Sequence, residues 1–192
     1  MEQIHSPSNP KIKKWQKLQT KKGRQEHQAF LIEGMHLLEE ALRCDITPEA
    51  VIVREGTELP EDWVEAFRQK GVPCYGVSPA IFQRLVATQT PQGAAAVLPL
   101  LNPKQALRAL LEKPRLTGLL VDGLQDPGNL GTMIRTAEAF GADFILLGLG
   151  TVDMYNDKVV RASMGSLFRL PVYHGKLEDW LPQLKAQGVT VA

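Results

Sequence analysis

The sequence predicts an α/β protein made of two successive domains, and three observations support this fold class. Short apolar runs such as "AVIV" (50–53) alternate with amphipathic stretches such as "MHLLEEALR" (35–43), which is the pattern of strands alternating with helices. The alternation pauses at a proline-bracketed stretch, 101–105, and then restarts. The chain has 192 residues, 44% hydrophobic and 22% charged, which are ordinary values for a globular protein. We therefore expect a mostly parallel α/β domain over residues 1–101 and a second domain over residues 102–192.

In the first domain, apolar periodicity and capping residues predict each element. We expect helices at 8–19, 35–43, 60–71 and 78–87, and strands at 29–34, 50–53, 72–77 and 94–100. Asn9 and Ser78 can cap helices, and each is followed by a proline suited to the first helical position. Trp15 shares an apolar stripe with Ile12 and Leu18, which favours a core position over an exposed base-stacking platform.

The second domain shows the same alternation. We expect helices at 103–113, 129–140, 156–167 and 177–187, and strands at 117–123, 143–148 and 168–173. The last five residues, 188–192, are typical of the start of a further strand. Because an α/β sheet normally covers such a strand with a helix, we interpret the chain as part of a longer protein.

Composition excludes several classes of protein. The longest apolar run, "AAAVLPLL" (94–101), is far shorter than the roughly 20 residues that a membrane-spanning helix needs. The N-terminus has no apolar core, so it is not a secretory signal. The two cysteines, Cys44 and Cys74, have no paired spacing. We therefore expect no membrane association, no disulfide framework and no metal site, and we expect a reducing, cytoplasmic location.

Positive charge is concentrated at the N-terminus. Residues 1–24 contain seven lysines and arginines against one acidic residue, Glu2, although the net charge of the chain is only +1. A basic segment on a nearly neutral protein indicates a polyanion as partner. The alternative, a lysine-rich and solvated helix face, is equally consistent with the charge alone.

The loop "DGLQDPGN" (122–129) leaves the carboxyl end of a predicted strand, where α/β sheets bind ligands. We expect Asn129 to cap the next helix, and Gly131 and Arg135, four residues apart, to share one helix face. The missing side chain at Gly131 leaves space beside Arg135 for a phosphate, which predicts an anion site. The alternative is an ordinary cap, a packing glycine and a surface arginine. P-loop and dinucleotide-binding fingerprints are absent, which disfavours other nucleotide-binding α/β enzymes.

Several segments resemble one family in the right order. "DPGNLGTMIRTAEAFGAD" resembles the first motif, Asn-x-Gly-x-x-x-Arg, of the SpoU branch of the SPOUT RNA methyltransferases, and "NDKVVRASMGSLFRLPV" resembles the stretch that follows it. "IHSPSNPKIKKWQKLQTKKGRQEHQAFLIEG" and "TPQGAAAVL" resemble the ribosomal-protein-like RNA-binding domain of such proteins. The resemblance implies that an α/β RNA-binding domain is followed by an incomplete Rossmann-like SPOUT domain with a trefoil knot.

The resemblance also implies an activity. Proteins of this family use S-adenosylmethionine to methylate a ribose 2′-oxygen in ribosomal or transfer RNA, and they work as homodimers. We expect ribosomal RNA of the 23S type as substrate. Two alternatives are methylation of transfer RNA and a non-catalytic RNA-binding protein. Two family motifs, a Gly-Asn-Glu loop and a late Ser-Leu-Asn segment, do not occur in this sequence. The cofactor-binding residues therefore stay unknown, and a polypeptide that stops at Ala192 is not expected to bind S-adenosylmethionine.

Site roles follow from the same resemblance. Asn129 and Arg135 match the catalytic positions. Because a guanidinium is almost never deprotonated, we expect Arg135 to clamp an RNA phosphate with two hydrogen bonds rather than to act as a base. Asn129 is expected to bind the ribose or Arg135, whereas Glu33 and Gly34 are expected only to end a strand and form a turn. The residues expected to contact RNA are Lys11, Lys14, Lys21, Arg24, Lys158, Arg161 and Ser163.

Overall fold

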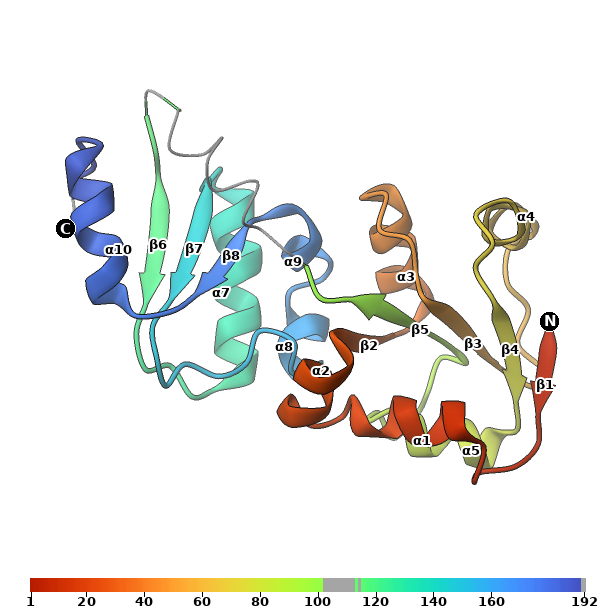
Figure 1. The fold of residues 1–192 in the computed structure, drawn as a ribbon. Coiled ribbons are helices and arrows are strands. Elements are labelled where there is room, and N and C mark those ends of the chain that lie inside the picture. The colour runs from red at the N-terminus through yellow and green to blue at the C-terminus, as the bar shows by residue number, and fades with distance from the viewer. Residues whose placement is uncertain (102–112, 114, 191–192) are drawn as a thin grey trace. The chain divides into compact units, whose positions relative to one another are not determined.

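A computed structural model of the chain describes residues 1–101, 113 and 115–190. The chain divides into two compact units, Met1–Leu100 with Tyr155–Asp157, and Leu101–Met154 with Lys158–Ala192 (Figure 1). Each unit combines a β-sheet with helices, so the α/β class expected from the sequence is confirmed. The helix expected at 103–113 lies, apart from Lys113, outside the described residues. No helix within the described ranges is long and apolar enough to cross a membrane.

The first unit is built on a five-stranded sheet with the strand order β1-β4-β3-β5-β2. Its strands are β1 (Glu2–Ile4), β2 (Ala29–Glu33), β3 (Ala50–Arg54), β4 (Cys74–Val77) and β5 (Ala94–Pro99). β1, β4 and β3 run parallel, whereas β5 runs antiparallel to both of its neighbours, β3 and β2. The sheet of this unit is therefore mixed, and the expectation of a mostly parallel one is corrected.

The loop before β5 explains the direction of this strand. Thr88 and the backbone N–H of Gln92 donate hydrogen bonds to Glu33 at the end of β2, with distances of 2.6 and 2.9 Å. The chain therefore enters β5 at the carboxyl edge of the parallel strands. A parallel connection has to return to the opposite edge first. The helix before the loop, α5 (Pro79–Leu85), has seven residues, and at 1.5 Å each it spans only about 10 Å.

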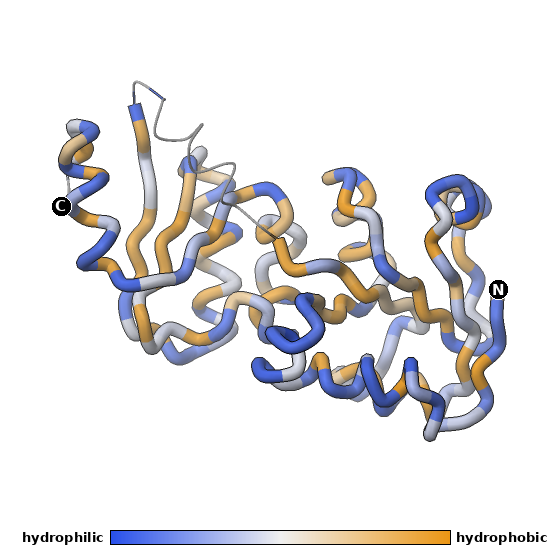
Figure 2. The backbone as a smooth tube through the Cα atoms, viewed as in Figure 1, coloured by the Kyte–Doolittle hydropathy of each residue, from blue (hydrophilic) through white to orange (hydrophobic). Residues whose placement is uncertain are grey.

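Helices cover both faces of this sheet. α1 (Pro10–Lys17) and α5 lie on one face, and α3 (Met35–Arg43) and α4 (Glu61–Gln69) lie on the other (Figure 1). Asn9 and Ser78 cap α1 and α5, as expected, because each side chain accepts a hydrogen bond from a backbone N–H of the first turn. Figure 2 shows that the strands are mostly apolar and that α1 alternates between apolar and hydrophilic positions.

The core of the first unit includes the apolar stripe of α1. Trp15 is 4% exposed, and its ring centroid lies 5.3 Å from that of Tyr75 in β4. Ile12 and Leu18 are also buried. The core position expected for Trp15 is confirmed, so its indole is not available for base stacking.

One helix of the first unit was not predicted from the pattern. α2 (Lys21–His27) buries only Gly23 and Arg24, so it lacks the apolar stripe that marks a helix in a sequence. Thr20 caps it by accepting a hydrogen bond of 3.1 Å from the backbone N–H of Gly23. A helix of this kind depends on its contacts with the rest of the unit rather than on its own periodicity.

The second unit has a parallel sheet in the order β6-β7-β8. Its elements are β6 (Gly118–Val121), α7 (Pro127–Ala139), β7 (Phe144–Leu147), α8 (Asp157–Ala162), α9 (Ser166–Arg169), β8 (Val172–His174) and α10 (Leu177–Ala186). α7 covers one face of the sheet and α10 covers the other (Figure 1). Phe144 and Leu146 pack with Leu184 of α10.

Two expected elements of this unit differ in the structure. The single helix expected at 156–167 is divided into α8 and α9, because Met164 and Gly165 both adopt left-handed backbone angles, with φ of 51° and 87°. The strand expected at 188–192 is not seen in residues 188–190, and the last two residues lie outside the described part of the chain.

Candidate functional site

The loop after β6 is held in place by the loop after β7. The Gln125 side chain donates a hydrogen bond to the Gly150 carbonyl, and the Val152 N–H donates one to the Leu124 carbonyl at 2.8 Å. Thr151 donates from its hydroxyl to the Val121 carbonyl at 3.3 Å. These bonds join the carboxyl ends of two neighbouring strands. They fix the position from which α7 begins.

Asp126, rather than Asn129, caps α7. The Asp126 carboxylate accepts a hydrogen bond of 2.6 Å from the Asn129 backbone N–H, and Pro127 occupies the first helical position. The cap expected at Asn129 is therefore wrong, because an equally good capping residue followed by a proline lies three residues earlier. The Asn129 side chain is exposed and makes no hydrogen bond to any described residue. Its carboxamide is thus available to a substrate.

Gly131 is a packing glycine. A Cβ atom at this position would lie 2.4 Å from the Ala162 Cβ and 2.7 Å from the Val159 carbonyl oxygen, both in α8. The open space expected beside Arg135 is therefore filled by α8, and this interpretation was wrong. Gly131 instead lets α7 and α8 approach more closely than any side chain allows. The segments that carry the family's first motif and the stretch after it are thereby brought together.

Arg135 lies one turn further along α7 and is exposed. Its guanidinium makes no hydrogen bond or ion pair with the described residues. Three residues on, Glu138 is engaged: Arg169 of α9 donates to its carboxylate through Nε and also through Nη2, the latter at 3.1 Å. Hydrogen bonds from Arg169 and, to a smaller extent, Ser166 lower the pKa of Glu138, against the effect of its partial burial. The described part of the site therefore contains a charged arginine without a counter-ion beside a carboxylate that is paired with another arginine.

The three candidates in and after α8 differ in accessibility. Lys158 is exposed and Arg161 is half-buried, and each of them interacts with another group of the protein. Ser163 is 1% exposed, and its hydroxyl donates a hydrogen bond of 2.8 Å to the Val160 carbonyl. The structure thus does not offer the Ser163 side chain to RNA, because the hydroxyl is buried and already bonded to the preceding turn.

Folding pairs three of the six lysines at the N-terminus with carboxylates. Nζ atoms lie 3.3 to 3.6 Å from carboxylate oxygens in the pairs Lys11–Glu2, Lys14–Glu49 and Lys17–Glu26. Lys13, Lys21 and Lys22 are exposed and have no such partner among the described residues. Of the lysines expected to contact RNA, only Lys21 belongs to this unpaired group. The carboxylate partners of the other N-terminal lysines lie in β1, in the next helix and directly before β3.

Arg24 is buried, at 5% exposure, and donates a hydrogen bond of 2.9 Å to the Leu18 carbonyl at the end of α1. Its guanidinium therefore connects α2 with α1 and does not lie on the surface. The structure thus does not offer the Arg24 guanidinium to RNA, and the sequence pattern around it gave no sign of the second helix.

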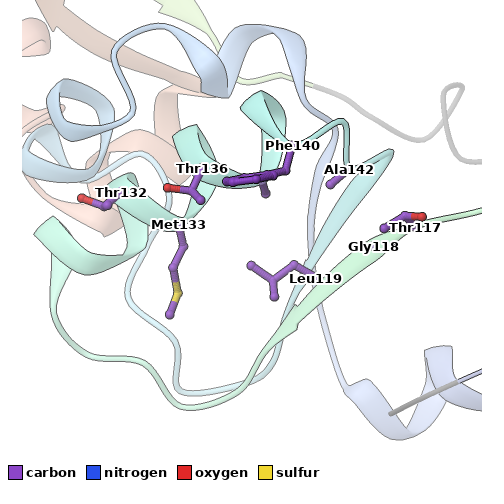
Figure 3. A pocket seen from close by; sticks show the side chains of 9 residues that line it. Thr117, Gly118, Leu119, Thr132, Met133, Thr136, Phe140 and Ala142 are labelled. Carbon is purple, nitrogen blue, oxygen red and sulfur yellow. The ribbon is translucent and has the colours of Figure 1, made fainter.

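An apolar cavity of about 410 Å³ lies between α7 and β6 (Figure 3). Met133 of α7, Phe140 directly after α7 and Leu119 of β6 contribute to it, and Phe140 is 87% exposed. A second cavity of about 400 Å³ borders the same strand and includes Phe144 and Leu184. The linings of both cavities hold no charged side chain, and their only hydroxyls come from threonines.

Comparison with known proteins adds a family to this geometry. The model of the MRM3-like substrate binding domain matches residues 9–96, and that of the SpoU rRNA Methylase family matches residues 117–192. The chain is 43% identical over 191 residues to the 23S rRNA (guanosine(2553)-2′-O)-methyltransferase RlmP of Bacillus subtilis, covering 100% of this chain and 72% of that protein. It is 36% identical to the uncharacterized tRNA/rRNA methyltransferase slr1673 of Synechocystis, covering 88% of this chain and 60% of that protein.

A solved structure is similar over almost the whole chain. The AdoMet-bound rRNA methyltransferase from Sinorhizobium meliloti aligns with a TM-score of 0.82 and 29% identity, covering 97% of this chain and 69% of that one. The similarity therefore extends through both units, each of which has its counterpart in that protein.

Proposed function

Because the chain belongs to the SpoU rRNA methylase family, we propose that the protein transfers a methyl group from S-adenosylmethionine to a ribose 2′-oxygen of ribosomal RNA of the 23S type. The observation that carries the proposal is Arg135, an exposed cation without a counter-ion among the described residues, on the helix that follows the strand-end loop. The 43% identity to RlmP, a 23S rRNA 2′-O-methyltransferase, supports this choice of substrate.

Arg135 is suited to positioning rather than to proton transfer. A guanidinium stays charged at any physiological pH, so it cannot accept the proton of the 2′-hydroxyl. Its planar fork can instead bind two oxygens of an RNA phosphate and hold the neighbouring ribose in one orientation. Aligning the hydroxyl with its reaction partner is itself a large part of catalysis. The Asn129 carboxamide, exposed and without a hydrogen bond to the described residues in the first turn of the same helix, can bind the ribose.

S-adenosylmethionine, when bound, supplies the electrophilic methyl group. The two cavities beside β6 do not fit this cofactor, because it carries an ammonium and a carboxylate, and neither lining has a charged side chain to meet them. The cofactor contacts are therefore not assigned to any described residue.

The first unit is proposed to bind the RNA substrate, since residues 9–96 match a substrate-binding domain. Its unpaired lysines are the best candidates for phosphate contacts. A paired lysine has to give up its carboxylate partner before it can bind a phosphate. Lys13, Lys21 and Lys22 have no such partner among the described residues. We extend the proposal to a homodimer that acts in the cytoplasm, as the family resemblance implies.

The proposed substrate can be tested by comparing the 2′-O-methylation of RNA from cells with and without the gene. We expect ribosomal RNA from a strain that lacks the gene to lose one 2′-O-methylated nucleoside that its parent contains. Mass spectrometry of nucleoside digests detects the loss, and the wild-type gene on a plasmid is expected to restore it. Unchanged ribosomal RNA together with a transfer RNA that has lost its methyl group would transfer the proposal to the second substrate class.

Two matched triple variants test which lysines meet the RNA. Replacing Lys13, Lys21 and Lys22 with Gln is expected to lower the log–log salt slope of RNA binding by about 2, since each single-strand phosphate contact contributes roughly 0.7. Replacing Lys11, Lys14 and Lys17 with Gln removes the same charge and is expected to lower the slope by less. Fluorescence anisotropy between low and high salt measures both. Equal slopes for the two variants would mean that the ion pairs do not decide which lysines bind.

A further inference from the structure

The sequence of α7 places an acidic residue where it could neutralise the proposed catalytic arginine. Arg135 and Glu138 are three residues apart, and side chains at this spacing are neighbours on a helix surface. An arginine and a glutamate three residues apart can form an ion pair, as Glu65 and Arg68 do, in the reverse order, in α4 at 2.8 Å. Arg135 and Glu138 form no such pair. Another group of the protein holds the Glu138 carboxylate instead.

That group is Arg169. It approaches Glu138 from α9 with two nitrogen atoms, one on each carboxylate oxygen. A two-point arginine–carboxylate pair is stronger and more strictly oriented than a single contact. The pair is also partly shielded from water, because the Glu138 and Arg169 side chains are 28% and 37% exposed. Arg169 therefore holds the carboxylate more firmly than an exposed neighbour on the same helix can.

The backbone around Arg169 fixes this geometry. The left-handed residues Met164 and Gly165 end one helix and begin the next, so that α9 lies against α7. Leu167, buried at 2% exposure, anchors α9, and the close contact of Gly131 with Ala162 anchors α8. Arg169 thus reaches Glu138 from a short helix that has a buried residue of its own and follows a helix packed closely against α7.

We propose that Arg169 is a positioning residue for RNA methylation, which keeps the Glu138 carboxylate away from Arg135 and neutralises it, so that Arg135 is free to bind an RNA phosphate. The inference rests on the proposed function. Without Arg169, the Glu138 carboxylate can pair with Arg135 and occupy it. The negative charge of Glu138, no longer balanced by Arg169, also repels the incoming phosphate. An exposed helix pair of this kind is weak, and repulsion between two charges in the partly shielded site adds to its effect.

A four-protein cycle on the full-length enzyme tests this role. The proteins are the wild type, Arg169→Gln, Glu138→Gln and the double variant. We expect Arg169→Gln to raise KM for RNA and lower kcat/KM by about three- to tenfold, because capture of Arg135 and repulsion of the phosphate act together. The double variant is expected to recover most of this loss, because it has no carboxylate left to capture Arg135. Arg68→Gln, which removes the matched ion pair of α4, is the control and is expected to leave the kinetics unchanged.

A second readout separates this role from simple structural support. The log–log salt slope of RNA binding is expected to fall by about 0.7 in Arg169→Gln, corresponding to one lost phosphate contact, and to return in the double variant. Thermal unfolding identifies any variant that merely folds poorly. If the ion pair only stabilises the unit, Glu138→Gln will be as impaired as Arg169→Gln and the double variant will show no recovery, which overturns the inference. If the wild type methylates no RNA at all, the proposed function itself fails.

Discussion

Arg135→Lys is expected to fold normally and to lose about 100-fold or more of the methyl-transfer rate, the usual cost of removing one positioning or electrostatic contact. The exposed side chain makes no bond within the described protein, so its replacement removes no internal interaction. Lysine keeps the charge but cannot bind two phosphate oxygens in one plane. Single-turnover rates with saturating RNA measure the loss separately from binding.

The control for this substitution is Arg68→Lys, which makes the same chemical change at an exposed position of α4 in the first unit. It is expected to leave the rate within about twofold, since surface changes away from a site have small effects. Turnover by Arg135→Lys close to that of the wild type would show that a point charge suffices, and the two-point clamp would be rejected.

Gly131→Ala is expected to destabilise the second unit by about 1 to 3 kcal/mol, the usual cost of overpacking. A loss of stability is unusual for this substitution, because alanine in place of glycine within a helix normally stabilises the protein by about 1 kcal/mol. Here the new methyl group would lie 2.4 Å from the Ala162 Cβ and 2.7 Å from a backbone oxygen of α8. The helices must separate, and Arg135 and Arg169 would move with them. Activity should therefore fall together with stability.

Urea unfolding of Gly131→Ala measures the loss of stability. The matched control is Gly128→Ala in the same helix, where a Cβ would meet only the Asp126 carboxylate oxygen, at 3.2 Å. Adding Ala162→Gly to Gly131→Ala removes the closer of the two clashes and is expected to restore part of the stability. A Gly131→Ala protein as stable as the Gly128→Ala control would show that α8 yields without cost.

Local sequence patterns predicted most of the elements, because the periodicity of buried positions is a property of neighbouring residues. The caps at Asn9 and Ser78 and the core position of Trp15 are of this kind. α2 was missed because a helix that buries only a glycine and an arginine leaves no periodic trace. The direction of β5 was missed because it depends on a contact between Glu33 and a loop more than 50 residues later.

The candidate site was predicted less completely, for the same physical reason. The exposed Asn129 and Arg135 are found by their motif. The role of Gly131 depends on α8, and the counter-ions of Lys11 and Lys14 lie in other segments of the chain. Arg169 could have been suspected from the spacing of Arg135 and Glu138, which ought to attract one another. Only the fold shows which third residue separates them.

The position of β5 in the sheet has a consequence for the synthesis of the protein. β2 pairs with no strand other than β5 in the described sheet, and Ala29 is matched with Pro99. During translation at about 5 to 20 residues per second, β2 therefore waits several seconds for its partner to leave the ribosome. Its apolar edge is unprotected in that interval, when it could pair with other nascent chains. Because the last strand is inserted between β3 and β2, the first unit should acquire its native order in one late step rather than progressively from its N-terminus.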